Sequence, residues 1–277
     1  MKKGQDTRGY QRYLALDIHR EYLLVGGWNG EKDWVLTPRR VSTEKFPEWA
    51  KKNIRSGDIV VLETTTNVWT TYDIVAALAS RVLVANAAEV GEIAQARVKT
   101  DKEDIKRLLK LLVGGIVPEV WVPPMYVREL RAFTSYRGRL VKTGVMIRNR
   151  LQSLLHKHNL QLSEAGLLDQ TWWESQKNIS SLEKLQIRQE LVLLQEVEKL
   201  KRAVDEELER QSTGAVWGKQ ALQLMQLPGV GYIVAMTVLA AIGDISRFEN
   251  AKQLVGYAGL GAGVHDSGKT HKEKKDH

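Results

Sequence analysis

The sequence of 277 residues predicts an α/β domain with a mixed β-sheet, followed by a mostly helical region. Two observations predict this fold class. Three strand-like segments precede the first helical pattern, and helical and strand-like segments alternate after them. The second half of the chain contains two long segments in which apolar residues recur every three or four positions, as on one face of an α-helix. The composition, with 43% hydrophobic and 27% charged residues, is that of an ordinary globular protein.

The elements of the first domain follow from residue type and period. Strands are expected over residues 13–18, 22–28, 34–36, 59–63 and 81–84, and helices over residues 45–53 and 69–78. Thr100 and Glu103 have the spacing of a capping box, which predicts the start of a further helix. The apolar positions of that helix are Ile105, Leu108, Leu109 and Leu112.

Glycines and prolines between residues 114 and 124 predict a linker after this domain. Long helices are expected beyond it, over residues 125–160 and 182–211, and a Gly-rich section starts near Gly214. The chain is therefore predicted to have three parts, which cover residues 1–118, 119–213 and 214–277.

Positive charge is concentrated between residues 128 and 157. This basic segment contains one acid, Glu129, and eight basic residues, whereas the net charge of the whole chain is only +8. On a helix most of the basic residues share one side, opposite an apolar face. A row of cations suits a linear polyanion, so we expect the segment to bind nucleic acid. Its basic residues are Arg128, Arg131, Arg137, Arg139, Lys142, Arg148, Arg150 and Lys157.

An alternative is that acids elsewhere in the fold balance this charge, as on most solvated helix faces. Residues 179–211 carry acids and bases in similar numbers, together with apolar residues at helical spacing. This pattern predicts a helix-pairing seam of a coiled-coil arm or hairpin. The apolar positions are Ile187, Leu191, Leu194, Val197, Leu200, Val204 and Leu208.

Four carboxylates form a candidate metal site. Asp17 and Glu63 each fall at the end of a predicted strand, where open α/β sheets place ligands, and Asp101 and Asp104 share one face of a helix start. Four such charges in one place need cations, and hard oxygen ligands favour Mg²⁺ or Mn²⁺. Alternatively, each acid alone is ordinary: acids often close strands, and Asp101 suits the positive end of a helix dipole. Metal-held acids together with a polyanion-binding helix indicate phosphodiester chemistry.

Two features near the C-terminus are weaker signals. Pro228-Gly229-Val230-Gly231 before an apolar helix, residues 232–242, resembles a helix-hairpin-helix turn, in which Gly229 and Gly231 let backbone amides approach a phosphate. An ordinary turn between packed helices is as good an explanation. Ser267 lies in a polar loop beside His265, Asp266 and Lys269, but by spacing alone a Ser-Gly pair usually marks a turn.

The residue inventory excludes several classes of protein. With no cysteine, the chain has no disulfide, thiol nucleophile or Cys-ligated zinc, and its six histidines form no HExxH motif. No segment approaches the roughly 18 to 20 apolar residues of a membrane span, and no signal-peptide core is present. We therefore expect a cytoplasmic protein that does not contact a membrane.

Together these motifs resemble the insertion-sequence-110 (110/116/902) family of DEDD transposases. The resemblance is carried by short motifs in a fixed order: Leu16-Asp17-Ile18, Leu62-Glu63-Thr64-Thr65, Lys99-Thr100-Asp101-Lys102-Glu103-Asp104, Arg148-Asn149-Arg150-Leu151, Leu227-Pro228-Gly229-Val230-Gly231, Ile242-Gly243-Asp244-Ile245-Ser246-Arg247-Phe248, Gln253-Leu254-Val255-Gly256-Tyr257-Ala258-Gly259-Leu260 and Ser267-Gly268.

The resemblance implies an N-terminal RuvC-like domain of the RNase H fold, a coiled-coil middle and a small helical transposase domain at the C-terminus. It implies that Asp17, Glu63, Asp101 and Asp104 bind the metal ions and that Ser267 is the nucleophile that links to cleaved DNA. It further implies a prokaryotic, nucleoid-associated recombinase that acts on element ends and target DNA. Family members are guided by a structured RNA and act as oligomers, so a dimer or tetramer is expected.

Three departures from the family pattern leave alternatives open. Thr66 stands where glycine is usual, and Ile105 where alanine commonly follows the last acid. The sequence ends ten residues after Ser267, so the helix that normally follows the serine is not expected, and the third part is predicted to be shortened. The alternatives are a metal-dependent nuclease or junction resolvase, and a truncated, inactive nucleic-acid-binding remnant.

Overall fold

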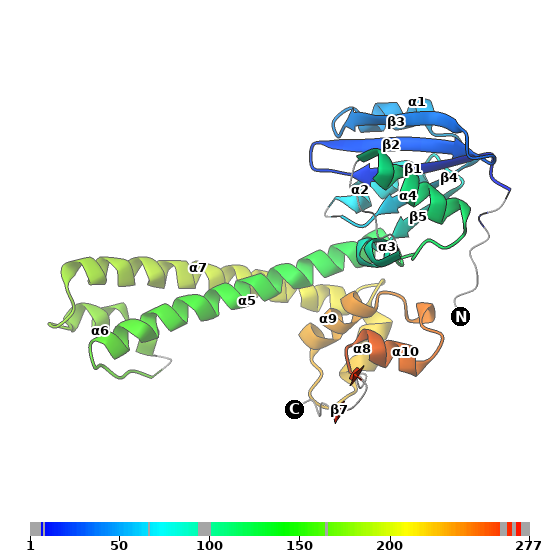
Figure 1. Cartoon of the computed structure of the whole chain (residues 1–277). Helices are drawn as coiled ribbons and strands as arrows, with labels where there is room; N and C mark the ends of the chain where they lie inside the picture. Colours follow the sequence, from blue (N-terminus) through cyan, green and yellow to red (C-terminus); the bar gives the residue numbers. More distant parts are fainter. Residues whose placement is uncertain are drawn as a thin grey trace. The chain divides into compact units, whose positions relative to one another are not determined.

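The computed structural model describes residues 7, 9–65, 67–93, 101–163, 166–260, 265–267 and 270–272, with side chains for all of these except residues 92, 93, 101 and those beyond 260. The chain forms two compact units, Met1–Val122 and Pro123–His277 (Figure 1). The boundary falls within the predicted Pro-rich linker.

A five-stranded mixed sheet forms the centre of the first unit. The strands are β1 (Arg12–Ile18), β2 (Tyr22–Asn29), β3 (Trp34–Ser42), β4 (Asp58–Glu63) and β5 (Arg81–Ala85), in the order β3-β2-β1-β4-β5. The first three strands pair antiparallel, and β4 pairs parallel with both β1 and β5. The predicted mixed α/β domain is thus confirmed. β3 extends beyond the predicted Leu36 and across Pro38, which an edge strand tolerates because one side of its backbone is unpaired.

Helices cover both faces of this sheet. On one face α4 (Asp101–Val113) buries the predicted positions Ile105, Leu108, Leu109 and Leu112 against β1, β2, β4 and β5. On the other face α1 (Phe46–Asn53) and α2 (Val68–Ala76) pack in a second core. The short helix α3 (Ala87–Ile93) follows β5 and was not expected from the sequence.

A long helical hairpin forms much of the second unit. α5 (Met125–Lys157) and α7 (Ser181–Ser212) pack side by side and run in opposite directions, as Figure 1 shows. Ser180 and Glu183 form a capping box at the start of α7. The 3₁₀ turn η1 (Gly166–Leu168) and α6 (Gln170–Ser175) fill the tip, where Trp173 is buried and donates a hydrogen bond from Nε1 to the carbonyl of Leu167.

The hairpin seam agrees with the predicted apolar period except at one position. Ile187, Leu191, Leu194, Val204 and Leu208 are buried, but Leu200 is 46% exposed, so its place in the seam was predicted wrongly. An apolar residue at this spacing can lie at the margin of a helix face that is about 100° wide.

Short helices complete the second unit at the base of the hairpin. These are α8 (Gly218–Met225), α9 (Tyr232–Ile242), the 3₁₀ turn η2 (Ile245–Arg247) and α10 (Ala251–Tyr257). α9 packs on both α5 and α7 and buries Ala235, Met236 and Ala240. A two-stranded antiparallel ribbon, β6 (His265–Ser267) and β7 (Thr270–Lys272), follows. Among the described residues, no helix is both long and apolar enough to span a membrane.

Candidate functional site

Asp17 and Glu63 lie at the carboxyl ends of two adjacent parallel strands. Leu16 of β1 pairs with Leu62 of β4, so the acid that follows each leucine lies at the same edge of the sheet. Neighbouring strands are about 4.8 Å apart, which places the two acids side by side. The alternate residues that precede them on both strands belong to the core under α4, so both acids face α4.

α4 supplies the third acid, Asp104, and a cation that lies between two of the acids. An Arg107 guanidinium nitrogen, Nη2, lies 3.3 Å from Oδ1 of Asp104 and 3.7 Å from Oε2 of Glu63. The side chains are largely buried, with exposed fractions of 20% for Arg107, 13% for Asp104 and 16% for Glu63. Two of the predicted metal ligands therefore gather around one positive charge.

Asp17 is held by a different partner, His19. The imidazole Nε2 of His19 lies 3.0 Å from Oδ2 of Asp17, and the ring stacks on Tyr22 with 4.5 Å between ring centroids. The Tyr22 ring limits the rotation of the His19 imidazole and so fixes the direction in which the imidazole meets the Asp17 carboxylate.

The fourth acid, Asp101, is the first residue of α4, and its side chain lies outside the described residues. The structure thus brings Asp17, Glu63 and Asp104 to one edge of the sheet and does not describe the Asp101 carboxylate.

The chemistry of these side chains suits a divalent cation. Carboxylate oxygens are the ligands that Mg²⁺ and Mn²⁺ prefer, and Glu63 and Asp104 already share a cationic neighbour. In the described part of the chain, no group of three or more Asp, Glu or His side chains is placed to hold a metal ion, and the positive charge found between Glu63 and Asp104 is that of Arg107.

Arg107 and His19 were not identified as site residues from the sequence. The available signals were local: Arg107 lies three positions after Asp104 on a helix, a spacing at which opposite charges meet, and His19 lies two positions after Asp17. Neither signal shows that Arg107 also reaches Glu63, because that contact depends on how α4 packs on the sheet.

The second unit places much of the basic segment against acids of α7. Four ion pairs cross the hairpin, and we call them the α5–α7 charge ladder: Arg137–Asp205, Arg148–Glu198, Arg150–Glu190 and Lys157–Glu183. The alternative explanation of the basic segment, balance by acids elsewhere in the fold, thus accounts for these four cations.

The remaining basic residues divide into two groups. Arg131 caps the C-terminal end of α9, since its guanidinium donates to the carbonyls of Ala240 and Ala241 at 2.7 and 2.8 Å. Arg128 is half-buried on the same part of α5. Arg139 and Lys142 are exposed, and Arg139 stays on its own helix, where it contacts Ser135 and the Tyr136 ring.

The glycine turn between α8 and α9 is exposed. Gly229 has φ of +82°, a left-handed conformation that favours glycine, and Gly231 is the N-cap of α9. A Cβ atom at either glycine would meet nothing within 4 Å. The turn thus leaves room for a ligand to approach the backbone at the start of α9.

Ser267 is the last residue of β6 and pairs with Thr270 of β7. Its side chain lies outside the described residues.

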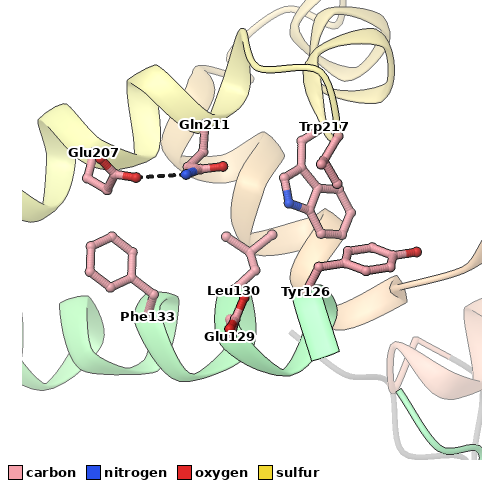
Figure 2. A pocket seen from close by; sticks show the side chains of 8 residues that line it. Tyr126, Glu129, Leu130, Phe133, Glu207, Gln211 and Trp217 are labelled. Carbon is pink, nitrogen blue, oxygen red and sulfur yellow. Dashed lines mark hydrogen bonds between the residues drawn. The ribbon is translucent and has the colours of Figure 1, made fainter. Parts of the chain in front are cut away.

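A cavity of about 350 Å³ lies elsewhere in the second unit, between α5, α7 and the start of α8 (Figure 2). Tyr126 and Trp217 pack as an aromatic pair on its wall, and Gln211 donates a hydrogen bond of 2.7 Å to Glu207. None of the predicted site residues lines this cavity.

Comparison of the sequence with known proteins shows a class of protein to which this chain is similar. Residues 221–276, from α8 to beyond β7, match the model of the IS116/IS110/IS902 family of transposases. The resemblance inferred from the sequence motifs is confirmed by this match.

Two individual relatives are also named as transposases. The chain is 23% identical over 175 residues, 61% of its length, to the transposase for insertion sequence element IS1111A of Coxiella burnetii. It is 28% identical over 178 residues, 64% of its length, to a Sinorhizobium fredii protein named provisionally as transposase y4qE. These alignments span 47% and 43% of the two relatives, so the chain matches slightly less than half of each.

Proposed function

We propose that this protein is a DNA transposase, a site-specific recombinase that cuts and rejoins DNA at the ends of an insertion sequence and at its target. Two relatives named as transposases and the family match over residues 221–276 support this class of activity. The observation that carries the proposed site is the approach of Glu63 and Asp104 to one cation, beside the strand end that bears Asp17.

The proposed fold of the first unit is RNase H-like, of the RuvC-like kind. Its support is the strand order β3-β2-β1-β4-β5, with three antiparallel strands followed by two parallel ones and acids at the ends of the two central strands.

The proposed metal ligands are Asp17, Glu63, Asp101 and Asp104, and the ion is Mg²⁺ or Mn²⁺. When bound, such an ion would polarise the scissile phosphate and offset the charge that develops on it. Arg107 and such an ion would compete for the same two carboxylates, so binding of the ion would require Arg107 to move away from Glu63 and Asp104. His19 lies 3.0 Å from Oδ2 of Asp17 and would orient this carboxylate.

Ser267 is the proposed nucleophile. Its hydroxyl oxygen would bond to phosphorus as the bond to a deoxyribose oxygen breaks, and the hydroxyl proton would pass to the leaving oxygen. The phosphodiester is conserved as a phosphoserine link that rejoining can reverse. Ser267 is the last residue of β6 and pairs with Thr270, the first residue of β7.

Nucleic acid would be held by the exposed cations of α5, Arg139 and Lys142, and at the glycine turn of Gly229 and Gly231. Arg128, Arg131, Arg148, Arg150 and Lys157 remain in the proposed binding set, although all five contact other protein groups in this structure. Guidance by a structured RNA is carried over from the family resemblance.

A homo-oligomer, a dimer or tetramer joined through a coiled coil, is the proposed assembly. Its support is a number of exposed apolar side chains on the hairpin: Val141, Val145 and Met146 on α5, and Val192, Leu193 and Leu200 on α7. Burial of such side chains between copies would remove about 25 cal/mol of unfavourable hydration per Å².

Trapping of a covalent intermediate tests the proposal. The full chain is incubated with DNA of the element ends, its structured RNA and Mg²⁺, then denatured, and protein–DNA adducts are separated by size. An adduct that disappears in Ser267→Ala and in Asp104→Asn supports the recombinase. Cleavage without an adduct would indicate a nuclease or resolvase that uses water, and DNA binding without any cleavage would indicate an inactive remnant.

A further inference from the structure

A basic groove lies on the first unit beside the acids, at a place that no sequence motif indicated. It has a volume of about 370 Å³ and is formed by β3, the adjacent part of β2 and the start of α4. We call it the β3 groove; its lining residues are Leu24, Trp34, Thr37, Pro38, Arg39, Arg40 and Lys102.

A bulge in β3 shapes this groove. The pairing of β2 with β3 shifts between Gly27 and Val25, so that Thr37 and Pro38 together oppose Gly26. A Cβ atom at Gly26 would lie 3.4 Å from Cγ of Pro38 and 2.7 Å from Cγ2 of Ile105. Because Gly26 has no side chain, the bulge and α4 can approach each other over this face of the sheet.

The described lining combines three cations with no carboxylate. Arg39 and Arg40 come from the edge strand, whereas Lys102 comes from the first turn of α4, and all three are exposed. Arg40 pairs with Leu24, so its side chain lies on the α4 face, whereas Arg39 pairs with Val25 and its side chain lies on the opposite face. Arg40 also lies over the ring of Tyr22, with 4.6 Å between its guanidinium carbon and the ring centroid. Cations from two separate elements that meet at one hollow are an arrangement that favours an anionic ligand.

Strand register connects the groove with the acids. Arg40 pairs with Leu24, and Leu24 pairs with Asp17, so one row across the sheet leads from the groove to the acid site. Two strand spacings separate the backbones of Arg40 and Asp17 by about 10 Å. A polyanion in the groove would therefore pass close to the carboxylates.

Protection of a sheet edge is the simplest alternative, because edge strands commonly carry prolines and cations that prevent pairing with other chains. That explanation accounts for Pro38 and for the arginines. It does not account for Lys102, which lies on a helix, or for the hollow that all three cations line.

We propose that the β3 groove binds the phosphate backbone of the DNA strand that is cut at the acid site. This inference rests on the proposed function, which supplies the strand, and adds the surface that leads it to the carboxylates. Lys102 is next in sequence to Asp101, and Arg39 and Arg40 lie on the far side of β2, so the groove contacts nucleotides beside the scissile phosphate.

Salt-dependent DNA binding by the full chain tests the inference. Binding of a short fluorescent single-stranded DNA is measured by anisotropy over a range of salt concentrations in EDTA, which prevents cleavage. The slope of log affinity against log salt concentration is negative, and each lost contact with a single-strand phosphate reduces its magnitude by about 0.7. The double variant Arg40→Gln/Lys102→Gln is therefore expected to reduce the magnitude of the slope by about 1.4.

Lys51→Gln/Lys52→Gln is the matched control, because it removes the same charge from exposed positions of α1, on the other face of the sheet. The control is expected to keep the wild-type slope, as is the charge-conserving variant Arg40→Lys/Lys102→Arg. A circular dichroism melt of each variant confirms that it is folded.

The outcomes separate this inference from the proposed function. If wild-type protein binds DNA and the groove variant has the same slope, the groove assignment is wrong and the transposase proposal stands. A slope change with an RNA of the same sequence but not with DNA would also overturn the assignment. If wild-type protein shows no salt-dependent DNA binding, both proposals fail.

Discussion

Glu63 and Asp104 approach the same guanidinium group, that of Arg107, although one acid ends a strand and the other lies on a helix. Carboxylates this close repel each other unless a cation lies between them. Arg107 supplies that cation from within the chain, so the two acids are stabilised without a metal ion. In the proposed function, a metal ion and Arg107 would be alternative partners for the same charges.

Loss of Arg107 is therefore expected to make the first unit depend on divalent ions. In Arg107→Gln the two carboxylates lose their shared partner, and we expect the free energy of unfolding in EDTA to fall by about 1 kcal/mol, since the pairs are only partly exposed. Mg²⁺ is expected to raise the urea midpoint of the variant more than that of wild type. The matched control is Lys106→Gln, whose partner Glu103 is an exposed neighbour on the same helix; equal Mg²⁺ effects in both variants would contradict the prediction.

The charge ladder predicts acid sensitivity of the hairpin. The pKa of Glu198 is lowered from its ordinary value of 4.5, because Lys201 and then Arg148 donate hydrogen bonds to its carboxylate. Lys157 and Ser180 lower the pKa of Glu183 in the same way, and Arg210 lowers that of Glu207 to about 2. A lowered pKa in the folded state means that the stabilisation is present above about pH 4.5 and is lost as the pH falls toward the folded-state pKa.

Thermal unfolding at pH 6, 4 and 3 measures this effect. Glu198→Gln is expected to be less stable than wild type at pH 6 and to lose less stability on acidification. Glu196→Gln serves as the control, because Glu196 lies on the same helix but its cation, Lys199, is 3.9 Å away and both are exposed. A wild-type hairpin with the same melting temperature at pH 6 and pH 3 would disprove the role given to these acids.

Gly26 is expected to tolerate no side chain without a loss of stability. In Gly26→Ala the new Cβ would lie 2.7 Å from Cγ2 of Ile105 and 3.3 Å from the Trp34 ring, so α4 or the β3 bulge has to shift. We expect the free energy of unfolding to fall by about 1–3 kcal/mol in urea titrations. Gly57→Ala, where a Cβ meets nothing within 4 Å, is expected to have little effect.

The basic segment is expected to divide into binding and structural cations. Arg139→Gln/Lys142→Gln removes exposed charges, so the salt slope for duplex DNA is expected to fall by up to about 1.8 with little change in the melting temperature. Arg148→Gln breaks a 2.6 Å ion pair with Glu198, and its main effect is expected to be a lower melting temperature. If instead Arg148→Gln reduced the salt slope and Arg139→Gln/Lys142→Gln lowered the melting temperature, the result would show that the charge ladder opens when DNA binds.

Local pattern predicted much of this fold. The order of strands and helices in the first unit and the two long helices of the second follow from apolar period and turn residues, which act within a few positions along the chain. The sequence did not predict α3, α6 or α8, and it ended β3 too early at Leu36. Short helices are stabilised mainly by tertiary packing rather than by propensity, so they leave a weak local signal.

The site was predicted less completely, because its contacts join distant segments. Asp17, Glu63 and Asp104 could be selected from strand ends and helix starts, but the part of Arg107 and the β3 groove depend on how α4 packs on the sheet. For the basic segment, contacts with a distant part of the chain reduced the predicted site instead of adding to it. An excess of cations within residues 128–157 indicated nucleic acid, whereas the acids that meet four of them come from α7.

The charge ladder also bears on how the chain behaves while it is being made. All four ladder cations lie on α5 and all four acids on α7, and Asp205 follows its partner Arg137 by 68 residues. A nascent chain that has completed α5 but not α7 is a polycation at its growing end. A fragment that stops before Ser181 would therefore bind nucleic acid more strongly than the full chain. Once α7 has been translated and has paired with α5, its acids neutralise the four cations and this non-specific affinity falls.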